Sequence, residues 1–216
     1  MITYVRNNYP DIVADLVQHL WLALIPVALG ALLALPIGYL AVRKGRRLYQ
    51  PIINVGAILY SIPSLALFLM IPVIIGVGYL SPLNVLIGLT LYSMALLTRT
   101  VADALVSVEG EATQAAAAMG YRPIAQLVGV ELPMAAPVLF AGLRVATVAN
   151  ISLVSVGALV GAGGLGNLFT GGFQLGFIEP IIVGIVLSML LAALCDVALV
   201  LLQRQLTPWT RTGARA

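Results

Sequence analysis

Long uncharged apolar runs constrain this chain more than any other feature. Residues 20–42 carry no charged side chain, and neither do residues 48–98. About 20 predominantly apolar residues in a helix rising 1.5 Å per residue cross a bilayer core roughly 30 Å thick. Only 9% of the chain is charged, whereas a soluble domain carries about 25%. The sequence therefore predicts an all-α integral membrane protein.

The apolar runs divide into five predicted spans. A Gly-, Ser- and Pro-containing stretch, residues 76–84, splits the longer uncharged run in two. The basic cluster at 43–47 and the arginines of the tail (Arg204, Arg211, Arg215) fall on one side, which the positive-inside rule assigns to the cytoplasm. The N-terminus is therefore expected outside and the C-terminus inside. The spans are expected at residues 20–42, 53–76, 84–104, 133–156 and 178–202, within a transmembrane domain of residues 20–204 followed by a cytoplasmic tail at 205–216.

The segment before the first span has helical amphipathic spacing. Apolar residues at positions 12, 13, 16, 17 and 20 share one side, while Asp11 and Asp15 fall on the other. This pattern predicts an interfacial helix within residues 1–19, lying against the outer membrane surface. We interpret His19, the one histidine, as a headgroup-level residue without a metal role, and Trp21 as an aromatic of the membrane interface.

Span two contains a proline that favours a break in the helix. Pro63 lacks a backbone N–H, and the hydroxyls of Ser61 and Ser64 can hydrogen-bond the carbonyl that this leaves free. A broken helix lining a pathway and a kink packed on a neighbouring helix both fit this pattern.

The charged residues near the spans have different expected partners. Arg144 lies partway along span four and is expected to face a cavity or a partner, or to be structural if it sits nearer the inner interface. Arg99 and Asp103, four residues apart at the inner end of span three, are expected to pair with each other. In span five, Asp196 is expected to snorkel or to reach Arg204.

Residues 161–166 match the pattern G-x-G-x-x-G through Gly161, Gly163 and Gly166, and Gly164 is a fourth glycine within it. No strand precedes this pattern and no acidic residue follows about 20 positions later, so a dinucleotide site is rejected. Two interpretations stay open: a close-packed gate element near the outer mouth, or a plain glycine-rich connector. Either way, a turn-forming stretch is expected to continue through Asn167, Thr170, Gly171 and Gly172 to Gly176.

The cytoplasmic loop at 105–132 is predicted to form two short helices joined at Gly120. Its Ala-rich part, residues 114–119, favours a helix, and Gly120 can take the left-handed conformation that ends one. Pro123 suits the first turn of the next helix, and Leu132-Pro133 is expected to close the unit. An ordinary amphipathic loop between two spans is the alternative.

The spacing of this loop resembles the EAA loop of ABC importer permeases. The matching positions are Gln114-Ala115-Ala116, Gly120, Val130 and Leu132-Pro133. Gln114 stands where that family usually has Glu, and Glu111 lies one turn earlier. The resemblance implies a coupling helix that docks into a groove of an ATPase subunit. The coupling residues expected from it are Glu111, Gln114, Ala115, Ala116, Met119, Gly120, Val130, Leu132 and Pro133.

More broadly, the chain resembles the five-span permeases of osmoprotectant importers, which handle glycine betaine, choline, carnitine or proline. Residues 62–67, 98–100 and 160–166 carry this resemblance, and permeases for methionine and other small solutes have similar segments. It implies the type I ABC importer permease fold in the bacterial cell membrane. The implied partners are a cytoplasmic ATPase dimer, an extracytoplasmic substrate-binding protein and a second or sibling permease. Ser61, Pro63, Ser64, Arg144 and the four glycines of 161–166 are the candidate pathway or gate residues.

Several function classes are excluded or weakened. The chain has no Walker-type Gly-Lys-Ser/Thr sequence, so ATP is expected on the partner subunit, with no cofactor or metal on this one. No catalytic constellation shares one compartment, so no catalytic residue is assigned. The basic cluster is short and lies between two spans, which disfavours nucleic-acid binding. A stand-alone secondary transporter or channel has little support, because intramembrane ionisable residues are few and no inverted repeat is visible.

Overall fold

The computed structural model describes residues 2–108 and 110–211, and every regular element within them is helical. The predicted tail residue Arg215 lies outside this part of the chain. In order, the elements are α1 (Ile2–Asn7), α2 (Tyr9–Arg43), α3 (Arg46–Ser61), α4 (Ser64–Ile75), α5 (Pro82–Val106), α6 (Gly110–Ala118), α7 (Pro123–Gln126), a π-helical turn (Leu127–Glu131), α8 (Leu132–Gly157), a 3-10 turn (Ala158–Val160), α9 (Gly166–Leu175), α10 (Ile178–Leu206) and a 3-10 turn (Pro208–Arg211).

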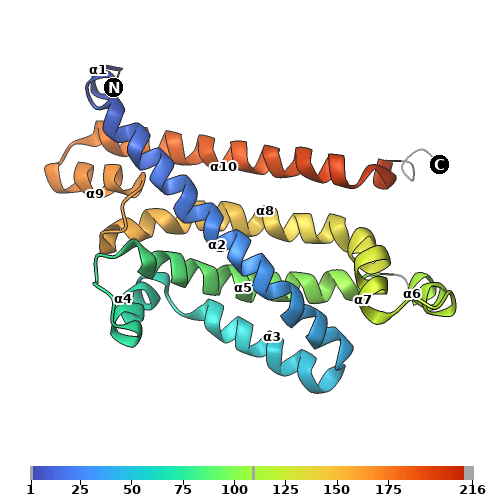
Figure 1. Ribbon diagram of the computed structural model, residues 1–216. Coiled ribbons are helices and arrows are strands. Elements are labelled where there is room, and N and C mark those ends of the chain that lie inside the picture. The colour runs from blue at the N-terminus through green and yellow to red at the C-terminus, as the bar shows by residue number, and fades with distance from the viewer. Residues whose placement is uncertain (1, 109, 212–216) are drawn as a thin grey trace.

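The long helices form a bundle whose two ends differ (Figure 1). At one end lie α6, α7 and the C-terminal end of α10. At the other lie the N-terminus, α1, α4 and α9. Helix α2 crosses α5 and α8, and its most extensive contacts are with α5. Small residues allow that approach, since a Cβ at Gly30 would lie 2.5 Å from Cβ of Ser93 and one at Gly38 would lie 2.7 Å from Val101.

Five segments coincide in order with the five predicted spans. Four are long, apolar and continuous: α2, α5, the stretch Pro123–Val160 that contains α8, and α10. The fifth is the pair α3–α4, which is bent by 100° between Ser61 and Ser64. The prediction of membrane-crossing helices and of an all-helical fold is thus confirmed.

The bend between α3 and α4 is a break and not a kink. The Ser61 hydroxyl donates to the carbonyl of Ile58 at 2.7 Å, whereas the carbonyl of Leu59, four residues before Pro63, accepts from the N–H of Ile62 at 3.3 Å. The carbonyl of Ile62 accepts a hydrogen bond from the hydroxyl of Tyr92, on α5. A side chain from another helix, rather than Ser64, therefore satisfies the backbone at the break.

Two predicted segments are corrected by the structure. Residues 9–19 do not form a separate interfacial helix, because α2 runs through them without interruption and buries Ile12 and His19. Only Ile2–Asn7 forms a separate helix before it. The turn-forming stretch expected up to Gly176 is instead the helix α9, since the left-handed backbone is confined to Gly161, Gly163 and Gly164 before it and Gly176 after it.

Candidate functional site

The candidate site is a projecting unit at one end of the bundle, residues 110–131, called here the coupling elbow. Its first arm is α6, which ends where Gly120 adopts φ +82°. The N–H of Tyr121 donates to the carbonyl of Ala116 at 3.2 Å, and that of Gly120 to Ala117 at 3.0 Å. This pair of bonds is the Schellman arrangement, which satisfies the last carbonyls of a helix. The elbow has the sharp turn that the position of Gly120 predicts.

The second arm of the elbow passes directly into α8. Helix α7 begins at Pro123, and the π-helical turn that follows joins α8 without a break. Pro133 has no N–H to continue the α-helical bonding, and here the N–H of Leu132 donates to the carbonyl of Leu127 instead. Leu132-Pro133 marks the boundary between the elbow and α8, as expected, but the chain stays helical across it. The elbow is an extension of α8.

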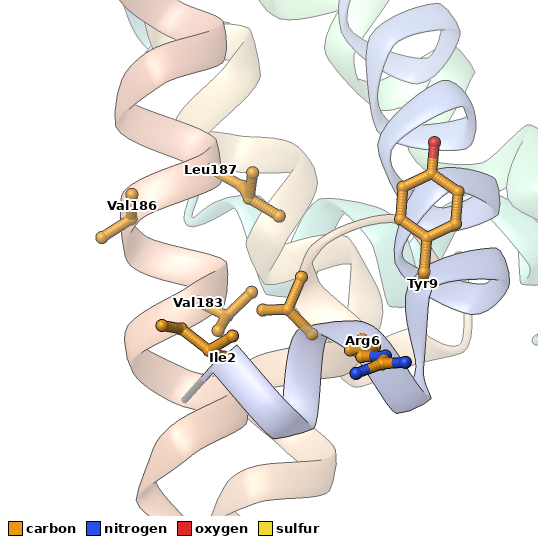
Figure 2. A pocket seen from close by; sticks show the side chains of 7 residues that line it. Ile2, Arg6, Tyr9, Val183, Val186 and Leu187 are labelled. Atoms are coloured by element: carbon orange, nitrogen blue, oxygen red, sulfur yellow. The ribbon is translucent and has the colours of Figure 1, made fainter.

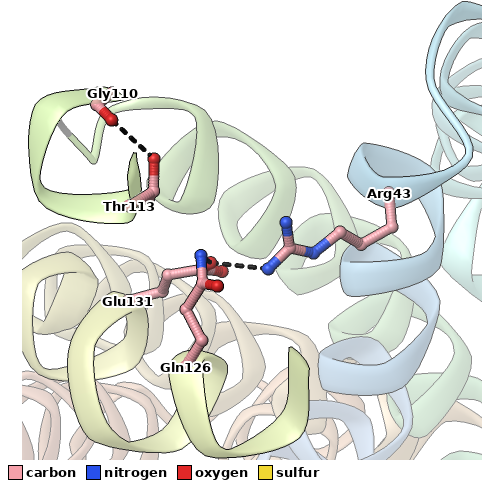
Figure 3. Close-up of polar contacts among 5 residues, drawn as sticks. All are labelled: Arg43, Gly110, Thr113, Gln126 and Glu131. Carbon is pink, nitrogen blue, oxygen red and sulfur yellow. Dashed lines mark hydrogen bonds and ion pairs between the residues drawn. The ribbon is translucent and has the colours of Figure 1, made fainter. Parts of the chain in front are cut away.

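An ion pair between an exposed guanidinium and a buried carboxylate fixes the elbow to α2 (Figure 3). A guanidinium nitrogen of Arg43, at the end of α2, lies 2.6 Å from Oε1 of Glu131, whose side chain is buried. The amide of Gln126 donates to the same carboxylate oxygen at 2.8 Å. The Arg43 guanidinium also lies 5.3 Å from the centre of the Tyr39 ring. Charge-assisted bonds of this kind are stronger than neutral ones, so they attach the second arm of the elbow to the end of α2.

The sequence analysis missed Glu131, Gln126 and the role of Arg43. One signal was present, because Glu131 is an acidic residue between Val130 and Leu132, at the same predicted boundary as the basic cluster 43–47. An acidic residue within an apolar run needs a partner of opposite charge.

The predicted coupling residues separate into an exposed group and a supporting group. Ala116 is 1% exposed, and Val130, Leu132 and Pro133 are half-buried in the junction with α8. The exposed group consists of Glu111, Gln114, Ala115, Met119 and Gly120.

The outer surface of the elbow also presents apolar side chains. Met119 is 70% exposed, Ile124 74% and Val128 60%, and Tyr121 is exposed beside them. Ile124 and Val128 thus point away from the bundle, whereas Leu127 packs against its core. Exposed apolar patches of a protein mark sites of interaction with another protein or with a membrane.

The predicted glycine pattern lies at the opposite end of the bundle, as residues 161–166, called here the glycine loop. The N–H of Gly164 donates to Oε1 of Gln18 at 3.1 Å, and the Gln18 amide donates to the carbonyl of Ala162 at 2.8 Å. Nδ1 of His19 accepts from the N–H of Leu165 at 3.2 Å. Its other ring nitrogen, Nε2, therefore carries the proton and donates to the carbonyl of Ile151, on α8, at 2.8 Å.

His19 is thus a fully buried residue that holds this loop, and not a headgroup-level residue. Asp15, one helical turn before His19, accepts a further hydrogen bond from the side-chain amide of Asn167 at 2.8 Å. The glycines have a packing reason, because a Cβ at Gly163 would lie 2.4 Å from Oε1 of Gln18 and one at Gly166 would lie 2.7 Å from the carbonyl of Ser155. The plain-connector interpretation leaves these contacts unexplained.

The remaining candidate pathway residues do not meet at one place. Arg144 makes a bidentate pair with Asp196 on α10, at 2.6 and 2.8 Å, so the expected contact of Asp196 with Arg204 is replaced by one with Arg144. The expected pair of Arg99 and Asp103 is confirmed at 3.6 Å. Ser61, Pro63 and Ser64 lie at the α3–α4 break, at the far end of α3 from the elbow.

Two hollows on the bundle differ in polarity. One, of about 570 Å³, lies between α3, α5 and α8 and is lined by Tyr60, Arg99, Asp103 and small residues such as Gly142. The other, of about 610 Å³, lies between α1, the start of α2 and α10 (Figure 2). There Ile2, Val183 and Leu187 provide an apolar lining, and Arg6 is its one charged residue. Only the first hollow carries groups of both charges.

In the described part of the chain, no group of three or more His, Cys, Asp or Glu residues is placed to hold a metal ion.

Comparison with protein families and curated sequences gives consistent matches over almost the whole chain. Residues 12–208 match the family described as "Binding-protein-dependent transport system inner membrane component". The chain is 36% identical over 209 residues to the osmoprotectant import permease protein OsmW of Salmonella typhimurium, covering 96% of this chain and 97% of that protein. It is 31% identical over 210 residues to the choline transport system permease protein OpuBB of Bacillus subtilis, covering 96% and 94%.

Solved structures provide an independent match of fold. An inward-facing structure of the MetNI methionine ABC transporter has a chain that superposes with a TM-score of 0.81 at 26% identity, covering 91% of this chain and 96% of that one. An amino acid ABC transporter with histidines superposes with a TM-score of 0.75 at 16% identity, covering 94% and 97%, which shows similarity of fold alone.

Proposed function

This chain belongs to the binding-protein-dependent transport system inner membrane components, and from that premise we propose that it forms the translocation pathway for an osmoprotectant such as glycine betaine, choline, carnitine or proline. It is the permease subunit of an ABC importer and a multi-pass inner membrane component. Its relatives are named as permeases for osmoprotectants, for choline, and for glycine betaine, carnitine and choline, and these names support the proposed class of solute.

The exposed surface of the coupling elbow is the observation that carries the proposed mechanism. An ATPase subunit covers this surface, and the apolar side chains of Met119, Ile124 and Val128 supply its contact area. ATP is bound and hydrolysed by that subunit, and this chain needs no cofactor. The basic residues at this end of the bundle support a cytoplasmic position for the elbow, by the positive-inside rule, with the glycine loop outside.

Movement of the elbow becomes movement of α8, because the second arm continues into that helix. Two such permease chains, identical or siblings, surround one pathway, and closure of the ATPase dimer moves them as rigid bodies. An extracytoplasmic binding protein delivers the solute at the opposite end. The hollow between α3, α5 and α8 is the candidate binding site for a small zwitterion along this route. Tyr60 offers an aromatic face to its cationic group, and Arg99 offers a guanidinium to its carboxylate.

Reconstituted transport tests the proposal. Proteoliposomes holding this chain, the ATPase subunit and the binding protein are expected to accumulate radiolabelled glycine betaine, choline, carnitine or proline only when ATP is enclosed with the ATPase. Omission of the ATPase subunit is the control. Absence of ATP-dependent accumulation of all four solutes would overturn the proposed solute class.

An amino acid such as methionine is the second candidate solute, because a methionine transporter chain superposes on this one at 26% identity over most of its length. Calorimetry on the cognate binding protein separates the two candidates, since it reports directly which solute is captured. A stand-alone secondary transporter or channel predicts solute flux through this chain alone under an ion gradient. The same proteoliposomes without the ATPase subunit measure that flux.

A further inference from the structure

We propose that α2 acts as a strut that crosses α8 and connects its two ends, which makes the coupling elbow and the glycine loop move as one piece. Arg43 and Glu131 are its positioning residues at the elbow, and Gln18 and His19 are its positioning residues at the loop. The proposal rests on the proposed function in one respect, because it takes the elbow as the part that a partner drives.

Helix α8 already joins the two regions along the chain. Its first residue follows the elbow, and its last, Gly157, precedes the glycine loop by a single 3-10 turn. The loop also bonds back to this end of α8, since the N–H of Ala162 donates to the carbonyl of Gly157 at 3.1 Å. Gly161, Gly163 and Gly164 have positive φ and no side chain, so the side chains that hold this part of the loop come from other elements.

Helix α2 provides a second attachment at the loop. The Gln18 side chain accepts a hydrogen bond from the N–H of Gly164 and donates one to the carbonyl of Ala162, so it binds the backbone on both sides of the turn. His19 binds the backbone of Leu165 and that of Ile151, on α8, through its two ring nitrogens. The imidazole is fully buried and therefore connects the strut, the loop and α8 at one junction.

The other end of α2 is attached to the elbow through the Arg43–Glu131 pair. The pair is 2.6 Å long, and Gln126 donates to the same carboxylate. Breaking it leaves a buried carboxylate without its counter-charge, which costs more than the loss of an exposed pair. The attachment therefore resists a change in the angle between α2 and the elbow.

Between these attachments α2 is one continuous helix. It runs from Tyr9 to Arg43 without a break, although Pro26 and Pro36 lie inside it. Close contacts of Gly30 with Ser93 and of Gly38 with Val101 hold it against α5. A continuous helix fixed at both ends and packed in the middle transmits displacement as a rigid body.

Distance measurements within one chain test the strut. Spin labels are placed on Ala117→Cys, in the elbow, and on Leu159→Cys, beside the glycine loop, in a Cys195→Ser background; both labelled positions are exposed. The chain is assembled with its ATPase subunit in nanodiscs, and electron–electron resonance is recorded with and without a non-hydrolysable ATP analogue. Labelled chain is diluted with an excess of unlabelled chain before assembly, so that the distance is measured within one copy. We expect one narrow distance that nucleotide does not change.

Glu131→Gln is expected to make this distance broaden or shift with nucleotide, and Gln18→Leu to do the same. ATP-driven uptake is expected to fall by about 2- to 30-fold in either variant. The double variant Arg43→Glu with Glu131→Arg restores the pair with its charges exchanged and should recover the narrow distance. Arg47→Gln, an exposed arginine at the same end of the bundle, is the matched control and should change nothing.

A nucleotide-dependent distance in the unaltered chain would overturn the proposal, because the elbow and loop would then move separately. So would a distance that stays narrow and constant in both Glu131→Gln and Gln18→Leu, because α8 alone would then suffice. A different measurement reports failure of the proposed function: the unlabelled, unaltered assembly would then show no ATP-driven uptake.

Discussion

The coupling elbow and the glycine loop both turn at a left-handed glycine, but their surroundings differ. Gly120 and Gly163 both adopt φ near +80°, each in a turn between two helical segments. A side chain added at Gly120 would meet nothing within 4 Å, whereas one at Gly163 would meet Gln18 at 2.4 Å. The glycine loop is therefore packed against its own chain, while the turn of the elbow is open. This difference leaves the outer surface of the elbow accessible to the ATPase subunit that we propose as its partner.

The largest effect is expected from Gly163→Val. The variant forces a β-branched residue into a left-handed conformation and displaces Gln18 from its two hydrogen bonds. Strain and the lost bonds together should lower the free energy of unfolding by about 2–4 kcal/mol. Thermal unfolding of the purified chain in detergent measures this change. Gly171→Ala, at a helical glycine with open space, is the control, and equal stability of the two variants would show that the packing around Gly163 does not stabilise the loop.

Gly120→Val should have a smaller effect on stability and a specific effect on coupling. Strain in the turn costs about 1–2 kcal/mol, but no contact is displaced, so the chain should still insert and fold. The ratio of solute imported to ATP hydrolysed should fall, because the elbow loses its fixed angle. Gly120→Asn, which tolerates the left-handed conformation better, should preserve the ratio. Unchanged coupling in the valine variant would contradict the role given to this turn.

Ile124→Ser tests the uncovered surface without disturbing the fold. The side chain is 74% exposed, so its replacement should change the free energy of unfolding by no more than about 0.5 kcal/mol. Binding of the ATPase subunit should weaken by about tenfold, because an apolar contact is lost at the interface. Titration of the labelled ATPase subunit onto nanodiscs measures this affinity. Equal affinity of the ATPase subunit for the unaltered chain and for the Ile124→Ser variant would show that the apolar face of the elbow is not the contact surface.

The smallest effect is expected from Arg99→Gln. Arg99 pairs with Asp103 at 3.6 Å, and both side chains are more than half exposed. Exposed pairs of this kind contribute little, so the free energy of unfolding should change by less than about 0.5 kcal/mol. A loss of stability comparable with that of Gly163→Val would show that the exposed ion pair is a structural element after all.

The sequence was informative wherever the signal is local. The uncharged runs predicted the membrane helices, and the start of α10 at Ile178 matches the predicted span at 178–202. The spacing from Gln114 to Pro133 predicted a helical elbow with its turn at Gly120. These features depend on helix period, length and single glycines, which neighbouring residues determine.

The errors concern contacts between distant residues. Ile151 and Leu165, the partners of His19, are 132 and 146 positions away and present only backbone atoms, so no sequence pattern identifies them. Glu131 and Arg43 are 88 positions apart, and Arg144 and Asp196 are 52 apart, although their charges could have been matched by membrane depth. The 100° bend at Pro63 likewise depends on Tyr92 from another helix.

The most direct test is to compare cross-linking of the ATPase subunit from the two ends of the bundle. A photoactivatable cross-linker on Met119→Cys, in a Cys195→Ser background, should link this chain to the ATPase subunit in membranes. The same reagent on Leu159→Cys, at the glycine-loop end, should not. Capture from the elbow alone is the predicted result. Failure to capture the ATPase subunit from the elbow, or equal capture from both ends, would contradict the claim that this chain is driven through the coupling elbow.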